Sequence, residues 1–118
     1  MAPRSAISGA IVTEPEAAMI EVTRSRFAVP LSAEAVARDW RARGFSCGLF
    51  VDPPGREWNG FVHDTDELVT VTEGRLEVEV AGEAAVLDPG DEVFIPRGAV
   101  HSVRNRSAGV ARWYYGYR

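Results

Sequence analysis

Two stretches of this chain decide its fold: residues 55–74, GREWNGFVHDTDELVTVTEG, and residues 90–105, GDEVFIPRGAVHSVRN. The first contains the pattern Gly55-x5-Phe61-x-His63-x3-Glu67-x6-Gly74. The second contains Gly90-x5-Pro96-x-Gly98-x2-His101-x3-Asn105. The 118 residues include only two histidines, and each stretch holds one of them. The imidazole donors of the whole chain are therefore concentrated in these two motifs.

The spacing of the polar residues predicts a metal site. Phe61 and His63 are two residues apart, so on a strand their side chains share one face. Glu67 begins the next strand-like run, and His101 begins a third run after a proline-glycine turn. Two imidazoles and one carboxylate that converge on one concave face are a ligand set for a divalent transition metal.

The two motifs resemble those of the cupin superfamily, whose members are small β-barrels with a metal in the barrel mouth. The resemblance covers about residues 45–117 and implies ligand roles for His63, Glu67 and His101. The second motif is in full register, but Phe61 stands where the family usually carries the first of two histidines. A phenyl ring has no lone pair, so this departure leaves the identity of the metal open.

The rest of the pattern is typical of an all-β jelly roll. Short runs with strand-like composition alternate with turns that contain glycine or proline, which supply the backbone angles of a reversal. About eight strands is the number in a double-sheet jelly roll, or double-stranded β-helix. The expected strands are residues 45–51, 60–63, 67–73, 75–80, 84–87, 92–95, 101–105 and 110–117.

The N-terminal part predicts an arm and one helix. Residues 1–30 read as an arm with short strands near residues 10–12 and 19–22, and residues 31–118 as the barrel domain, with a helix at 33–43 and the barrel at 45–117. Ser32 is suited to cap the helix, and Val36 and Trp40 lie on one of its faces. We expect that face to pack on the outside of the barrel.

Composition excludes several classes of function. A net charge of −4, with no lysine in the chain, offers no basic stripe for a nucleic acid. Cys47 is the single cysteine, which fits a reducing compartment, and no apolar run is long enough to span a membrane. We therefore expect a cytoplasmic protein with neither a nucleic-acid nor a membrane partner. The resemblance adds a homodimer, because small cupins commonly pair.

Several other residues could belong to the site. Trp58 and Phe61 are the expected walls of a substrate pocket, whereas Asp64 and Asp66 are expected in a solvated turn. Trp113, Tyr115 and Tyr117 share one face of the last strand. An aromatic core or a dimer seam is the favoured interpretation of that face, and a share in the pocket stays open.

A site with two histidines and one glutamate supports more than one chemistry. A six-coordinate ion would keep three adjacent positions free, as in non-haem iron enzymes, whereas zinc would hold one activated water. Iron, manganese, nickel, copper and zinc all remain open. We expect a metal-dependent enzyme acting on a small oxygenated organic molecule, dioxygenase-like or isomerase/lyase-like. The alternative is a non-catalytic module that binds or senses a small ligand.

Overall fold

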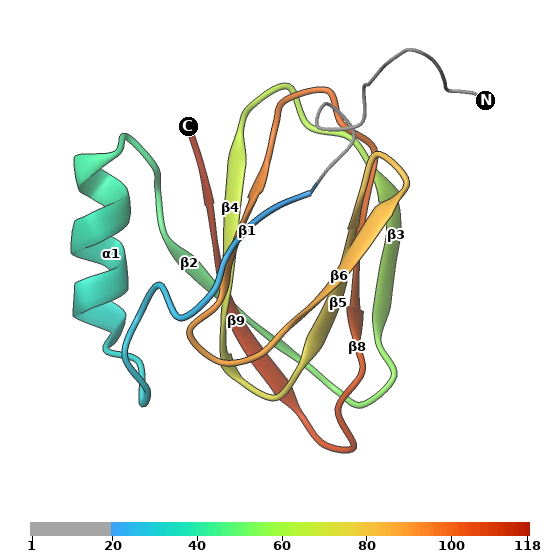
Figure 1. The fold of residues 1–118 in the computed structure, drawn as a ribbon, viewed down its shortest axis with the longest axis horizontal. Coiled ribbons are helices and arrows are strands. Elements are labelled where there is room, and N and C mark those ends of the chain that lie inside the picture. The colour runs from blue at the N-terminus through green and yellow to red at the C-terminus, as the bar shows by residue number, and fades with distance from the viewer. Residues whose placement is uncertain (1–19) are drawn as a thin grey trace, which may run out of the picture.

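The structure, a computed structural model, describes residues 20–118. Within this range, two antiparallel sheets face each other, and a single helix stands outside them (Figure 1). The expected jelly-roll cupin architecture is confirmed. The elements are β1 (Glu21–Thr23), α1 (Ala33–Ala42), β2 (Gly48–Asp52), β3 (Glu57–Phe61), β4 (Glu67–Glu73), β5 (Leu76–Val80), β6 (Glu83–Leu87), β7 (Glu92–Ile95), β8 (His101–Asn105) and β9 (Ala111–Tyr117).

The chain crosses repeatedly between the two sheets, as a jelly roll requires. The five-stranded sheet has the order β1-β7-β4-β9-β2, and the four-stranded sheet has the order β3-β8-β5-β6. The loops before β4 and β8 lie together at the top of the barrel in Figure 1. The first residues of these two strands therefore meet at one end, and this end carries the site described below.

The strand predicted at residues 60–63 is wrong in its bounds, because β3 contains a β-bulge. The strand runs from Glu57 to Phe61, and its register with β8 shifts between Trp58 and Phe61. Without a bulge, these two residues would point to opposite faces because they are three apart. The extra residue places both on the inner face, and Gly60 adopts the positive φ of 73° that glycine tolerates best. His63 lies beyond the end of the strand, not on it.

The helix packs against the five-stranded sheet, as expected, although it ends at Ala42 and not at residue 43. The side chain of Ser32 accepts a hydrogen bond from the backbone N–H of Ala35 and so caps the first turn. Val36 and Trp40 are fully buried in a cluster with Phe45 and Leu68. This cluster lies between helix and sheet and is separate from the barrel core.

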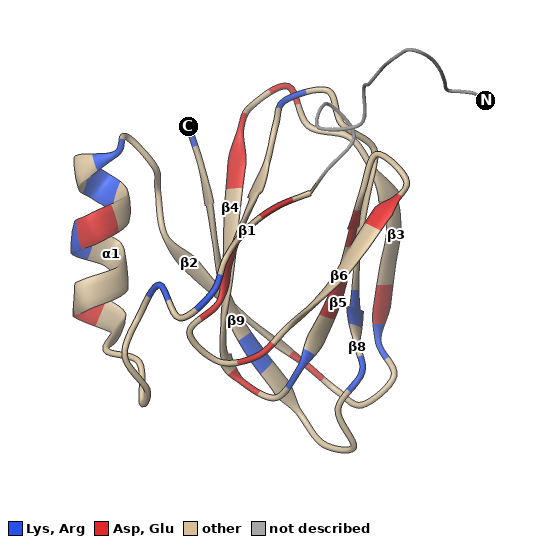
Figure 2. Cartoon of the chain, viewed as in Figure 1, with Lys and Arg blue, Asp and Glu red and all other residues tan. Residues whose placement is uncertain are grey.

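The barrel core is mostly aliphatic, and the charged side chains of β5 lie on the outer face of its sheet. Buried side chains from both sheets fill the interior, among them Val69, Leu76, Val78, Val93 and Ile95. The outer face of the four-stranded sheet instead carries ion pairs (Figure 2). In each pair, an arginine that lies in β8 or just after its last residue contacts a glutamate of β3 or β5. This alternation of apolar and charged positions fixes which face of β5 looks inward.

The expected short strand near residues 19–22 is observed as β1, which pairs with β7. The strand expected at residues 10–12 lies outside the described residues. Within residues 20–118, no helix is both long enough and apolar enough to cross a membrane.

Candidate metal centre and its pocket

Three potential metal ligands come together at the mouth of the barrel. Glu67 opens β4, His101 opens β8, and His63 lies in the loop between β3 and β4. One ligand atom from each residue lies within 4.8 Å of those of the other two. Oε1 of Glu67 is 3.3 Å from Nε2 of His101 and 3.7 Å from Nε2 of His63. The structure therefore brings together the three residues that the motifs single out.

The backbone fixes the orientation of the His101 ring. Its Nδ1 lies 3.1 Å from the carbonyl oxygen of Ala99, which can only accept a hydrogen bond. Nδ1 therefore carries a proton, and Nε2 faces Glu67. Burial of His101 opposes its protonation, but the nearby carboxylate of Glu67 and the Ala99 carbonyl outweigh it, so the pKa is raised above the ordinary 6.5.

The loop that carries His63 is tied down on both sides. The backbone N–H of Gly98 donates to the carbonyl of His63 at 2.9 Å. Asp66 accepts a hydrogen bond from the backbone N–H of Arg97 at 2.9 Å and pairs with the guanidinium of Arg118 at 2.8 Å. The carboxylate of Asp66 is therefore occupied in holding the loop, and Asp64 is exposed.

The buried oxygen of Glu67 shows that the three side chains fit a cation. Glu67 is buried, yet its Oε1 has no hydrogen-bond partner of good geometry among the described residues, although the Nε2 atom of His101 is close. A buried carboxylate oxygen without a partner is costly. A divalent ion between this oxygen and the two imidazole nitrogens would satisfy it with the donor types that transition metals favour.

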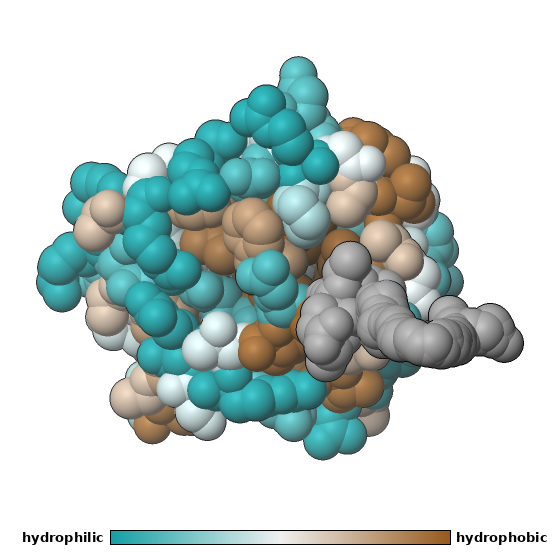
Figure 3. All heavy atoms as spheres, turned by 45° about the horizontal axis from the view of Figure 1, so that its top comes forward, coloured by the Kyte–Doolittle hydropathy of each residue, from teal (hydrophilic) through white to brown (hydrophobic). Residues whose placement is uncertain are grey.

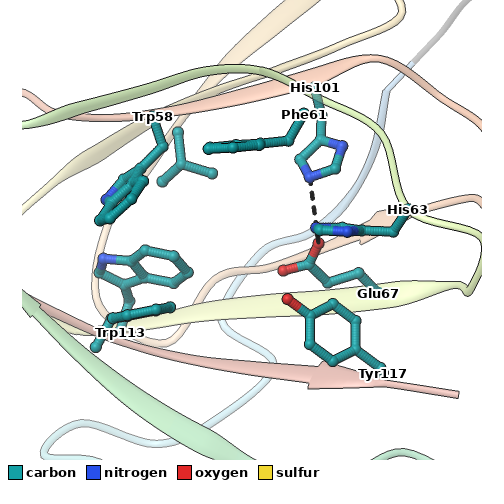
Figure 4. Close-up of a pocket in the computed structure, with 9 residues that line it drawn as sticks. Trp58, Phe61, His63, Glu67, His101, Trp113 and Tyr117 are labelled. Carbon is teal, nitrogen blue, oxygen red and sulfur yellow. Dashed lines mark ion pairs between the residues drawn. The ribbon is translucent and has the colours of Figure 1, made fainter.

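An aromatic cavity of about 170 Å³ opens beside the three side chains (Figure 4). Trp58 and Phe61, the two expected pocket residues, both line it. The ring of Phe61 lies nearly parallel to that of His63, at 7°, with 6.4 Å between centroids. Phe61 therefore stands next to the three side chains, as the motif register indicates.

The rest of the cavity wall comes from residues that the motifs do not contain. Trp113 and Tyr117 on β9, Phe50 on β2 and Val103 on β8 complete the lining. The face shared by Trp113, Tyr115 and Tyr117 thus serves the pocket as well as the core, where Tyr115 stacks on Phe50 at 4.7 Å. The alternation of side chains along β9 indicates that these three aromatic residues share one face. It does not indicate whether that face points into the barrel.

One further residue stands behind this wall and was not anticipated. Asp52, the last residue of β2, is buried and accepts hydrogen bonds from the indole N–H groups of both Trp58 and Trp113. The distances are 3.1 and 2.9 Å. Asp52 therefore holds the two indoles in place from outside the cavity.

Tyr117 lies on the side of the cavity that holds Glu67 (Figure 4). Its ring contacts that of His63 edge-on, with 5.1 Å between centroids. Burial first, and then the charges of Glu67 and Tyr115, raise the pKa of the Tyr117 hydroxyl above its ordinary value of 10. This hydroxyl is therefore protonated at neutral pH and is a hydrogen-bond donor beside the three side chains.

The rim of the mouth is partly hydrophobic. Phe61, Val62 and Val100 are exposed, although the last two do not line the cavity. With the top of Figure 1 turned forward, Figure 3 shows hydrophobic side chains reaching the surface between hydrophilic ones. A ligand that enters at this end therefore meets apolar as well as polar surface.

Comparison with known proteins gives a family and a set of similar folds. The family model described as a cupin domain matches residues 48–117, which is more than half of the chain. No curated protein matches the sequence. The crystal structure of TT1209 from Thermus thermophilus is 35% identical with a TM-score of 0.57, covering 62% of this chain and 71% of that one.

Two more distant structures show the fold alone. The cupin domain of Cnp3 from Schizosaccharomyces pombe is 23% identical, with a TM-score of 0.59 over 62% of this chain and 54% of that one. Salicylate 1,2-dioxygenase from Pseudoaminobacter salicylatoxidans is 19% identical, with a TM-score of 0.57 over 62% of this chain. The match spans only 19% of the dioxygenase chain.

Proposed function

The chain belongs to the cupin domain family, and from this we propose that it is a metal-dependent enzyme acting on a small oxygenated organic molecule. The observation that carries the proposal is the buried, unpartnered oxygen of Glu67 between the two imidazoles. We assign His63, Glu67 and His101 as the ligands of one divalent transition metal. Bound there, the metal would polarise an oxygen of the substrate or activate a small molecule beside it.

The residues around the centre suit a ligand with an apolar body and an oxygen-bearing end. Phe61 removes one donor that a histidine would supply, and so leaves more of the metal open to exogenous ligands. The Tyr117 hydroxyl would donate a hydrogen bond to an oxygen bound near Glu67. The aromatic wall would exclude water from the rest of the ligand.

Two reaction classes agree with this arrangement, dioxygenase-like and isomerase- or lyase-like. The likeness to a salicylate dioxygenase lies in the fold alone and does not decide between the two classes. No specific observation favours the non-catalytic binding or sensing module. Tyr117 gives the site a hydrogen-bond donor besides the ligands, which would stabilise charge that develops on a substrate oxygen.

Metal content tests the ligand assignment. Protein purified without added metal should contain one divalent ion per chain, measured by plasma emission spectroscopy. His101→Ala should lose most of the metal, because it removes a buried donor. Asp64→Ala is the matched control and should retain it, because Asp64 is exposed and lies outside the three-residue group. Equal losses in the two variants would reject the assignment.

Oxygen consumption separates the two reaction classes. The iron-loaded protein is mixed with a panel of small hydroxy- and keto-acids, and dissolved oxygen is followed with an electrode. Uptake that depends on both iron and one acid supports the dioxygenase class. Conversion of an acid without oxygen, detected by proton NMR, supports the isomerase or lyase class. If neither occurs with any divalent metal and acid of the panel, the enzyme proposal fails in favour of a binding module.

A further inference from the structure

The aromatic cavity has two chemically different ends. The three candidate ligands and Tyr117 lie at one end, and Trp58 and Trp113 lie at the other (Figure 4). None of the described residues that line the cavity is a lysine or an arginine. At the far end, the side chains that face the cavity are therefore uncharged aromatic or aliphatic groups.

A negative charge is buried directly behind this far end. Asp52 is only 3% exposed, and its side chain accepts hydrogen bonds from the two indole N–H groups. Within residues 20–118, no lysine or arginine forms an ion pair with it. Buried carboxylates are usually paired with a cation. Asp52 has neutral donors instead, so its charge is left without a counter-ion.

The hydrogen bonds to Asp52 also determine what the indoles offer to a ligand. Both N–H groups are used, so the ring carbons of Trp58 and Trp113 are what these side chains offer to a ligand, and Phe50 packs against both rings at a tilt. The face of an indole attracts cations, and donation of its N–H to a carboxylate polarises the ring further in that direction. The guanidinium of Arg56, which does not line the cavity, already lies 4.1 Å from the centroid of the Trp58 ring.

We propose that the site takes a small zwitterion whose methylated ammonium group lies against Trp58 and Trp113 and whose carboxylate lies at the metal end. The second half of this statement rests on the proposed function, because the metal supplies the positive charge at His63, Glu67 and His101. The first half depends only on Asp52 and the indoles. The two ends of the cavity thus have opposite charge, and a zwitterion matches both.

The size of the cavity sets the size of the ligand. A cavity of about 150 Å³ accepts a benzene molecule, so the 170 Å³ here suits a ligand of about eight non-hydrogen atoms. A neutral hydrocarbon group of the same shape would gain burial of apolar surface at the indoles. A methylated ammonium group gains that burial together with attraction to the ring faces and to Asp52.

Two isosteric probes test the charge preference. Glycine betaine and 3,3-dimethylbutanoate have the same shape and carboxylate, but one carries a quaternary nitrogen where the other carries a carbon. Calorimetric titration into zinc-loaded protein should give a dissociation constant for betaine about tenfold lower. Equal binding, or tighter binding of 3,3-dimethylbutanoate, would overturn the proposal.

Variants locate the source of the preference. Asp52→Asn keeps an acceptor oxygen for the indoles but removes the charge, so the ratio between the two probes should fall to within about threefold. Trp58→Phe removes one of the two N–H groups that reach Asp52 and should lower the same ratio if Asp52→Asn does not fold. Asp64→Asn removes an exposed carboxylate and should leave the ratio unchanged. An unchanged ratio in Asp52→Asn, with a melting curve like that of the wild type, would exclude Asp52 as its source.

The test remains informative if the metal assignment is wrong. Zinc content is measured before each titration. If the protein binds no zinc, the proposed function fails, but tetramethylammonium, which has no group for a metal, still probes the indole end. It should quench or shift tryptophan emission at lower concentration than tert-butanol does. No difference between these two probes would reject the cation site independently of the metal.

Discussion

Phe61 is the residue at which the chain departs from the motif of its family. It pairs with His101 across β3 and β8, and its ring lies beside that of His63. A side chain at this position therefore reaches the same space as the candidate ligands. The exposure of Phe61 at the mouth argues that it is not simply part of the barrel core.

Replacing Phe61 by histidine should add a donor to the metal centre. We expect Phe61→His to lower the dissociation constant for the metal and to reduce any oxygen uptake, because one open coordination position is lost. Calorimetric metal titration measures the first effect and the oxygen electrode the second. Val62→His, one residue further and outside the cavity lining, is the control and should change neither.

The opposite outcome has a distinct signature. If Phe61 only fills space, a histidine at this exposed position would be hydrated and would not reach the metal. The protein would then show no change in metal affinity and only a small change in unfolding free energy.

The raised pKa of His101 predicts opposite pH trends with and without metal. In metal-free protein, the protonated ring is stabilised by Glu67. The pKa of His101 is higher in the folded protein than in the unfolded chain, so protonation of this ring stabilises the fold. This stabilisation is fully present below the unfolded pKa of about 6.5 and is lost as the pH rises through the folded pKa. Metal binding needs the deprotonated ring, so affinity should already weaken above pH 6.5 as the pH falls.

Melting temperatures measured between pH 5.5 and 8.5 check both trends. The difference between wild type and His101→Ala should shrink with rising pH in chelator-treated protein and grow with rising pH in zinc-loaded protein. Parallel trends in the two preparations would contradict the linkage between Glu67 and His101.

At the scale of elements, strand β9 joins the pocket to the helix. Trp113 and Tyr117 point to the cavity, whereas Tyr114 and Gly116 point to α1 and the segment before β2. A Cβ atom on Gly116 would lie 1.9 Å from the carbonyl oxygen of Ser46 and 2.8 Å from the Trp40 ring. The strand can therefore approach the helix this closely only with glycine there.

Gly116→Ala should destabilise the fold through overpacking. We expect a loss of about 1–3 kcal/mol in unfolding free energy, measured by urea denaturation. Gly109→Ala is the matched control, because a Cβ atom there meets nothing within 4 Å. A loss of similar size in both variants would show that the effect is not the close approach to Ser46 and Trp40.

The sequence predicts those strands in which apolar and polar residues alternate clearly. It does not predict features that depend on a local irregularity of the backbone, such as a β-bulge. Runs such as 67–73 and 101–105 agree with the structure to the residue, since their hydrophobic pattern and flanking turns agree. The prediction for β3 is wrong, because its bulge breaks the two-residue period at Asn59 and Gly60. The roles of Phe50 and Asp52 depend on which strands become neighbours across the barrel, and one sequence does not contain that information.

At the scale of the whole molecule, one sheet edge carries exposed apolar side chains, and no strand among residues 20–118 pairs with its outer side. β2 is the outermost strand of the five-stranded sheet, and Leu49 and Val51 on it are 47% and 46% exposed. Open edges with apolar side chains are sites of pairing with another chain. They support the expected homodimer and give it a place on the surface.

Light scattering coupled to size exclusion should therefore give twice the chain mass of 12.9 kDa. Leu49→Lys should shift the protein toward monomer, because a charge on an edge strand opposes pairing. Val110→Lys, also exposed but outside the strands, is the control. A wild-type mass of one chain would reject the homodimer.

The shared hydrogen bonds of Trp58 and Trp113 to Asp52 have an optical consequence. Two of the three tryptophans in the chain line the cavity. The third, Trp40, is fully buried between α1 and the five-stranded sheet. Most of the environment-sensitive emission of the protein should thus originate at the pocket wall. Copper, nickel or iron ions in the mouth should quench that light, because their partly filled d shells accept energy or electrons from the excited indole, whereas d10 zinc should leave it bright. The tryptophans of the wall therefore act as a built-in fluorescent reporter that distinguishes copper, nickel or iron from zinc.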